Sequence, residues 1–205
     1  MHEMRLTTRE VLDLAVSWIV ISLCFSARGV YINLEHFSTL FVSSLIAVGL
    51  GFLLHELMHR TVARSFTCHA EYKMWPLGLL LALALAFASR GNLIFAAPGA
   101  VYIVPLARLL YMSAKELRRI YGLIALAGPM ANLALALIFY PLQGLSIHPF
   151  VDFTTMVGFR VNLWLAAFNL LPIPPLDGFN VVKWSPIMWG LVSIPTWTVV
   201  ALAIF

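Results

Sequence analysis

Charged side chains are scarce in this sequence. Only 11% of its 205 residues are charged, whereas 61% are hydrophobic. A soluble domain of this length would be about one quarter charged. The composition therefore excludes an ordinary soluble domain and predicts an integral membrane protein. The chain has room for roughly five or six spanning helices, because each helix needs about 20 residues to cross a bilayer.

Cysteine and strong net charge are also nearly absent. Cys24 and Cys68 are the only cysteines, and they lie in or near apolar segments without a CxxC pattern. We interpret them as free thiols rather than metal ligands. The net charge of +4 does not predict nucleic-acid binding, because excess Lys and Arg in a membrane protein usually mark cytoplasmic loops. No small-residue cleavage site follows the first apolar run, so no cleavable signal peptide is expected.

Long apolar runs make up most of the chain. The run at 77–88 is too short to span a bilayer. The segment at 93–104 is β-branched and aromatic around a Pro-Gly pair, which is typical of a hairpin. We therefore predict an all-α polytopic membrane protein of about five to six transmembrane helices with a short re-entrant or β-hairpin element. The apolar runs cover residues 11–27, 37–63, 77–88, 120–142, 153–171 and 186–205.

Positive charges indicate which side of the membrane each connection occupies. Lys and Arg gather at the N-terminus, after the second apolar run, at 108–119 and after the prolines of 172–175, whereas Arg28 stands alone at the first opposite turn. We expect the basic groups on the cytoplasmic side of a cell membrane. Segment 74–105 has basic flanks at both ends, so it must return to its starting side, and we prefer a hairpin over two short spans. Its non-helical backbone would need protein or a water-filled cavity around it.

The second apolar run ends in HELMH, which contains His55, Glu56 and His59. Histidines four residues apart share one face of a helix, so both rings could reach one metal ion. The glutamate beside the first histidine could take a proton from a zinc-bound water, whose pKa is about 7. Ionisable side chains at the end of a membrane helix need partners and are functional by default. The pattern therefore favours a zinc site over a chance string.

A catalytic zinc site needs a third protein ligand. Asp177 is the preferred candidate, because the prolines of 172–175 break the preceding helix and Gly178 permits a tight turn that could direct the carboxylate inward. The alternative for this aspartate is a purely structural role as a helix cap or turn residue. The other candidates lie on the opposite side of the membrane or in the polar stretch after the second run: His36, His69, Glu71, His148 and Asp152.

Three segments together resemble the site-2 protease family of intramembrane zinc metalloproteases. They are HELMH, GPMAN at 128–132 and NLLPIPPLDG at 169–178. They occur in the order found in that family, each near the cytoplasmic end of a helix, and the re-entrant element falls between the first and the second. The resemblance covers roughly two thirds of the chain, from the second helix to the third motif, by a count of about 20 residues per span.

The resemblance implies an activity and a set of site residues. It implies a zinc endopeptidase that cleaves a transmembrane protein substrate within the lipid bilayer, with Glu56 as general base. Asn169 matches a position that contacts substrate or stabilises the reacting carbonyl. Asn132 matches the polar position of the second motif and is equally interpreted as a substrate contact or as an interhelical hydrogen-bonding residue. One zinc ion per chain would be held by three ligands: His55, His59 and Asp177.

The remaining polar features have structural interpretations. Arg160 lies in the middle of an apolar run and should face the interior, a cavity or a carboxylate such as Asp152, with a structural pairing preferred. A strand edge near 93–104 could pair with an unwound substrate. We expect one domain over residues 1–205, with a catalytic core at about 37–180 and no PDZ or CBS domain.

Two alternatives compete with the intramembrane protease. A membrane zinc protease of the prenyl-protein processing type also uses HExxH, but its third ligand would be a later glutamate, and no glutamate follows Glu116. A catalytically silent relative that binds transmembrane segments, or a metal carrier, would have no use for Glu56 as a general base. No oligomeric state is predicted.

Overall fold

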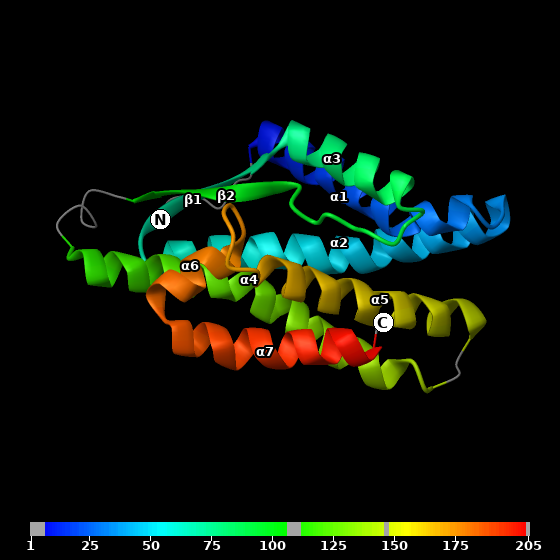
Figure 1. Cartoon of the computed structure of the whole chain (residues 1–205). Helices are drawn as coiled ribbons and strands as arrows, with labels where there is room; N and C mark the ends of the chain where they lie inside the picture. Colours follow the sequence, from blue (N-terminus) through cyan, green and yellow to red (C-terminus); the bar gives the residue numbers. More distant parts are fainter. Residues whose placement is uncertain (1–6, 106–111, 146–147, 204–205) are drawn as a thin grey trace.

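The computed structural model describes residues 7–105, 112–145 and 148–203, and the predicted basic residue Arg108 lies outside these ranges. The described chain forms seven helices and one two-stranded sheet (Figure 1). In chain order these are α1 (Thr8–Val30), α2 (Leu34–Ser65), β1 (Cys68–Met74), α3 (Pro76–Ala88), β2 (Gly99–Pro105), α4 (Ala114–Leu142), α5 (Pro149–Asn169), α6 (Asp177–Trp184) and α7 (Pro186–Ala203).

The helices confirm the predicted fold class of an all-α polytopic membrane protein. Among the described residues, four helices are long and apolar enough to cross a membrane, namely α1, α2, α4 and α7. This number is below the predicted five to six. α5 has 21 residues, enough for about 31 Å, but Asp152, Arg160 and Asn162 lower its hydropathy. α3 has only 13 residues and is too short for a span, as predicted.

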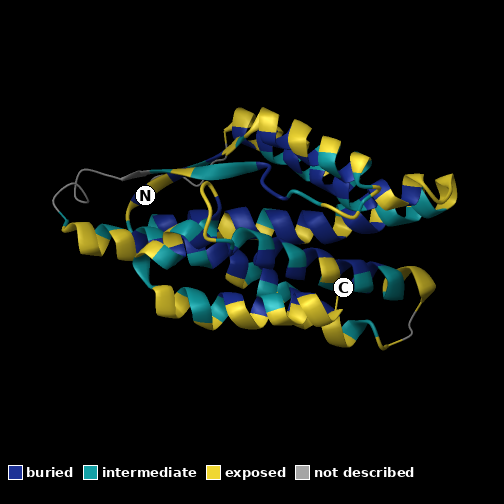
Figure 2. Ribbon diagram, viewed as in Figure 1, coloured by how far each residue is buried: buried dark blue, intermediate teal, exposed yellow. Residues whose placement is uncertain are grey.

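Helix α2 runs through the centre of the bundle. It packs against α1, α4 and α5 and also contacts the sheet. Figure 1 shows α1 and α3 on one side of α2 and α4, α5 and α7 on the other. Buried residues concentrate along α2, whereas the outward faces of α3 and α7 are exposed (Figure 2). Large apolar side chains such as Leu80 and Leu191 are exposed there, and apolar surfaces of this kind mark contact with a membrane or a partner.

The sheet pairs strands that are far apart in the sequence. β1 and β2 are antiparallel, with Cys68 opposite Pro105 and Met74 opposite Gly99. The expected strand therefore exists, but it begins at Gly99 and its partner precedes α3, so 93–104 is not a local hairpin. The sequence identified the strand and missed its partner, because strand pairing over this separation leaves no local pattern. The chain turns after α3 at Arg90, which has a φ of 55°.

Carboxylates of α1 hold β1 in place. The Tyr72 backbone N–H donates to Glu10 Oε1 at 3.2 Å, and the Met74 backbone N–H donates to Asp13 Oδ2 at 3.2 Å. Glu10 Oε1 also accepts from Arg60 Nη1 at 2.6 Å, and both side chains of this ion pair are buried. One acidic residue thus joins α1, α2 and β1. The consequence is that β2 is fixed along the interior cavity described next.

Candidate metal centre

Two helices bring the three predicted metal ligands together. His55 and His59 lie one turn apart on α2, with their Nε2 atoms 2.9 Å apart. Asp177, the first residue of α6, places Oδ2 at 3.2 Å from both Nε2 atoms. A tetrahedral zinc ion with bonds of about 2.0–2.1 Å would separate its ligand atoms by about 3.3 Å. The donor set and its spacing therefore fit zinc.

A glycine makes room for this cluster. A Cβ at Gly128 of α4 would lie 2.6 Å from His55 Nε2 and closer still to His59 Nε2. Any larger residue would occupy the space into which the two imidazoles point. The GPMAN segment therefore places a residue without a side chain next to the space in which a metal ion would bind.

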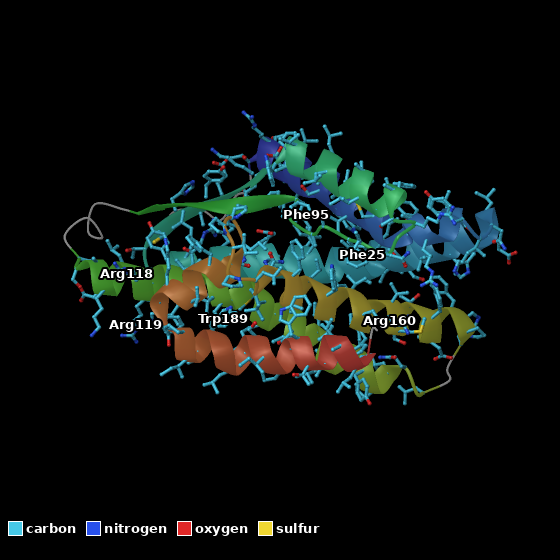
Figure 3. The ribbon with its side chains drawn as sticks, viewed as in Figure 1. Phe25, Phe95, Arg118, Arg119, Arg160 and Trp189 are labelled. Carbon is cyan, nitrogen blue, oxygen red and sulfur yellow. The ribbon has the colours of Figure 1, made fainter. Side chains whose placement is uncertain are left out.

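Asp177 is positioned by the end of α5 and by α7. The prolines of 172–175 cannot continue a helix, and Trp189 of α7 donates its Nε1–H to the Leu170 carbonyl at 2.7 Å (Figure 3). A Cβ at Gly178 would collide with that same carbonyl oxygen. This glycine thus allows α6 to start directly against the end of α5, which is a different reason from the tight turn that the sequence suggested.

Hydrogen bonds on the far ring nitrogens orient both imidazoles. His59 Nδ1 is 2.7 Å from the Ile124 carbonyl, which can only accept, so this nitrogen donates. His55 Nδ1 is 2.6 Å from Asn132 Oδ1, and we assign the same tautomer. With Nδ1 of each ring engaged in this way, each Nε2 faces Asp177. Bonds of this type fix the ring orientation of metal-binding histidines.

Asn132 and Asn162 form a fully buried network behind His55. Asn132 Nδ2 donates to the Gly51 carbonyl at 3.0 Å and to Asn162 Oδ1 at 3.1 Å. Asn162 Nδ2 in turn donates to the Gly158 carbonyl at 2.9 Å. Neither side chain is exposed. Substrate contact by Asn132 stays a prediction, whereas its place in this network joins α2, α4 and α5. Asn162 was visible in the sequence only as a polar residue in an apolar run.

Glu56 and Asn169 line the cavity beside the ligand cluster. Its volume is about 100 Å³, and its walls include β2 residues and the segment before Asp177, so it can hold several water molecules. Glu56 is buried, and its Oε2 has no hydrogen-bond partner in the described chain. Asn169 donates from Nδ2 to the Leu165 carbonyl at 2.9 Å. Asn132 is not among the residues that line this cavity.

The Asp177 carboxyl is held in its ionised form. Burial by itself raises its pKa, but the charges and hydrogen bonds of His59 and His55 outweigh burial and leave the pKa well below its ordinary value. An ionised carboxylate is the form that binds a metal ion.

The other candidates considered from the sequence lie elsewhere. In the part of the chain that the structure describes, the cluster of metal-binding groups contains no glutamate and no cysteine. Cys24 and Cys68 are free and buried, as predicted. His148 accepts from the Phe150 backbone N–H at the start of α5. The third member of the cluster is an aspartate, which disfavours the prenyl-protein processing type of site.

Comparison with known proteins identifies relatives along nearly the whole chain. No protein-family model matches the sequence, and no solved structure matches it. The chain is 44% identical over 194 residues to a Methanocaldococcus jannaschii protein named "Putative zinc metalloprotease MJ0611". The aligned region covers 93% of this chain and 92% of that protein. The chain is 30% identical over 159 residues to "Putative zinc metalloprotease YwhC" of Bacillus subtilis, over 67% of this chain and 66% of that protein. The chain therefore belongs to the same family of zinc metalloproteases as these two relatives.

Proposed function

We propose that this protein is a site-2-protease-like intramembrane endopeptidase that cleaves transmembrane segments of membrane proteins, using one zinc ion per chain. The observation that carries the proposal is the position of the ligand cluster. His55 and His59 lie within a 32-residue apolar helix at the centre of the bundle, and the general-base candidate Glu56 is buried beside them. A site of this kind inside a membrane domain suits a substrate that also lies in the membrane.

His55, His59 and Asp177 would hold the metal ion. Zinc, when bound, supplies a Lewis acid that polarises a carbonyl and lowers the pKa of water. Glu56 Oε2 accepts a proton from the attacking water, whose oxygen forms a bond to the scissile carbonyl carbon. Glu56 then donates that proton to the leaving nitrogen as the C–N bond breaks. The unpartnered Oε2 supports this role, because a buried carboxylate oxygen without a hydrogen bond is costly unless a ligand or water completes it.

The cavity walls would hold the substrate backbone. A transmembrane helix must unwind before one of its peptide bonds can be hydrolysed. β2 lines the cavity, so an extended substrate could pair with its edge. Asn169 on the opposite wall would contact the reacting carbonyl or a backbone group freed by unwinding. Asn132, in this proposal, acts through His55 rather than on the substrate.

The site would lie toward the cytoplasmic face of a cell membrane. Arg64 and Lys73 follow the metal ligands in the chain, and Arg118 and Arg119 lie at the end of α4 away from Arg160 (Figure 3). Basic residues of this kind usually face the cytoplasm and anionic headgroups. We still expect a single catalytic domain that lies in the lipid bilayer. We expect no nucleic-acid partner.

The test compares Glu56→Gln with the wild type in proteoliposomes. Zinc content by elemental analysis and cleavage of a membrane-anchored substrate are measured together. Glu56→Gln should keep zinc and lose at least about 100-fold in activity, whereas Asp177→Ala should lose zinc as well. Glu35→Gln, an exposed glutamate at the other end of α2, is the matched control. Undiminished cleavage by Glu56→Gln would refute the mechanism, and cleavage outside the transmembrane segment would refute the intramembrane site.

A further inference from the structure

Arg160 has no role in the metal centre and no described ionic partner. The expected pairing with Asp152 is not made, because no carboxylate of the described residues lies within 4.0 Å of the Arg160 or Arg28 guanidinium nitrogens. Arg160 is exposed although it lies in the middle of α5. An arginine at membrane depth is costly and usually marks a functional site. The residues around Arg160 therefore indicate its role.

Arg160 and Arg28 line one open cavity, which we call the basic cavity. It has a volume of about 420 Å³ and is bounded by α1, the start of α2, residues 91–94 and α5. His36 also lines it, and none of the described residues that line it is acidic. Phe25 of α1 and Arg160 of α5 lie in the same part of the bundle (Figure 3). Two fixed positive charges in a largely apolar cavity fit an anionic group carried on an apolar molecule.

The basic cavity adjoins the metal-centre cavity along three shared walls. On α1, Ile21 lines the metal-centre cavity and Phe25, one turn later, lines the basic cavity. On the segment before β2, Ala96 lines the metal-centre cavity and Ile94 lines the basic cavity. On α5, Leu165 lines the metal-centre cavity and Val161 lines the basic cavity. About one helical turn of packed side chains therefore separates the two cavities, and a transmembrane segment of about 30 Å is long enough to reach both.

A hydrogen bond ties two of these walls together where the cavities adjoin. Trp164 Nε1 donates to the Ile94 carbonyl at 3.1 Å, which joins α5 to the segment before β2. A substrate that passes from one cavity to the other must run beside this contact.

We propose that the basic cavity holds the part of the substrate segment that lies away from the scissile bond, and that Arg160 and Arg28 select segments with an acidic side chain there. This inference rests on the proposed intramembrane protease. Arg160 is nine residues from Asn169, which is about 13–14 Å along a helix. The acidic residue should therefore lie about four residues from the scissile bond if the substrate is extended, or about nine if it stays helical.

The substrate is preferred over a lipid because of the shared walls. An anionic headgroup would be satisfied by Arg28 and Arg160 alone and would not require continuity with the metal centre. A substrate segment uses both cavities at once. Its carboxylate, otherwise costly in the bilayer, would pair with two cations that have no carboxylate partner among the described residues.

The experiment uses the full zinc-loaded chain in phosphatidylcholine vesicles. Model transmembrane substrates carry one Asp at successive positions along the segment, and each is compared with the same substrate carrying Asn. The ratio of kcat/KM for Asp over Asn should peak at about tenfold or more within four to nine residues of the cleavage site. Arg160→Gln and Arg28→Gln should each bring this ratio close to one. Arg90→Gln is the control, because this arginine lies over the Tyr31 ring and does not line the basic cavity.

Charge reversal at Arg160 provides the decisive comparison. Arg160→Glu should cleave the substrate with Lys at the preferred position better than the one with Asp. A flat ratio at every position in an active wild type would overturn this inference and leave the proposed function intact, whereas absence of any transmembrane cleavage would overturn the proposed function itself. Activation by anionic lipid that depends on Arg160 but not on the substrate acid would assign the cavity to lipid and also overturn the inference. Zinc content and thermal melting identify variants that fail to fold. If the Arg160 variants fail to fold, the Arg28→Gln variant tests the inference.

Discussion

Replacing Asn132 by leucine should weaken zinc binding without touching a metal ligand. The change keeps the number and branching of the side-chain heavy atoms but removes the acceptor 2.6 Å from His55 Nδ1 and the donor to Asn162 Oδ1. Each buried polar group left unpaired costs about 1–3 kcal/mol. Loss of a partner that orients a metal-binding histidine typically lowers metal affinity about 10- to 100-fold, which corresponds to about 1.4–2.7 kcal/mol. The two magnitudes agree, so we expect Asn132→Leu to raise the zinc Kd by that factor.

The assay equilibrates purified variants with zinc buffered by a competing chelator and measures bound zinc. Asn169→Leu is the matched control, because this asparagine lies on the cavity wall and its Nδ2 bonds only to the Leu165 carbonyl. It should change the zinc Kd by less than about twofold while lowering cleavage. Asn132→Asp should fall between the wild type and the leucine variant, since it keeps an acceptor for His55 but opposes Asn162 Oδ1. If Asn132→Leu melts earlier yet binds zinc as tightly as the wild type, the network stabilises the bundle without orienting the histidine.

Three further predictions concern the site and the sheet. Gly128→Ala should lower zinc affinity at least about tenfold by pushing the His59 ring aside, whereas Gly144→Ala, with nothing within 4 Å of the new methyl, should have no effect on bound zinc. Glu10→Ala removes the acceptor that the Tyr72 backbone N–H and Arg60 Nη1 share and should cost about 1–3 kcal/mol for the buried backbone N–H left unpaired, so an unchanged melting temperature would contradict the anchoring role. Zinc removal by a chelator should abolish cleavage until zinc is restored, and zinc retention should fall as pH is lowered, because protons compete with the metal for both imidazoles; equal retention at pH 8 and pH 5 would argue against histidine ligation.

Local sequence properties were sufficient for most of the helices. A membrane helix depends on about 20 contiguous apolar residues, so α1, α2, α4 and α7 could be located from composition. The predicted run at 153–171 also forms a helix, α5, but it contains polar residues such as Asn162, whose Oδ1 accepts from Asn132 of a neighbouring helix. The partner of β2 was missed. Strand pairing depends on which segments meet in space, and α3 separates β1 from β2 along the chain.

The sequence alone predicted that His55 and His59 share one helix face, because the helical repeat places residues i and i+4 together. It also singled out Asp177 as the preferred third ligand, through the prolines before it. Only the tertiary structure decided how close these groups lie, that Gly128 leaves space for a metal ion, and that Asn132 and Asn162 stand behind His55. The cavity shared by Arg28 and Arg160 likewise depends on how α1 and α5 pack. Helix periodicity can be recognised from consecutive residues, whereas distances between helices depend on the packing of the whole bundle.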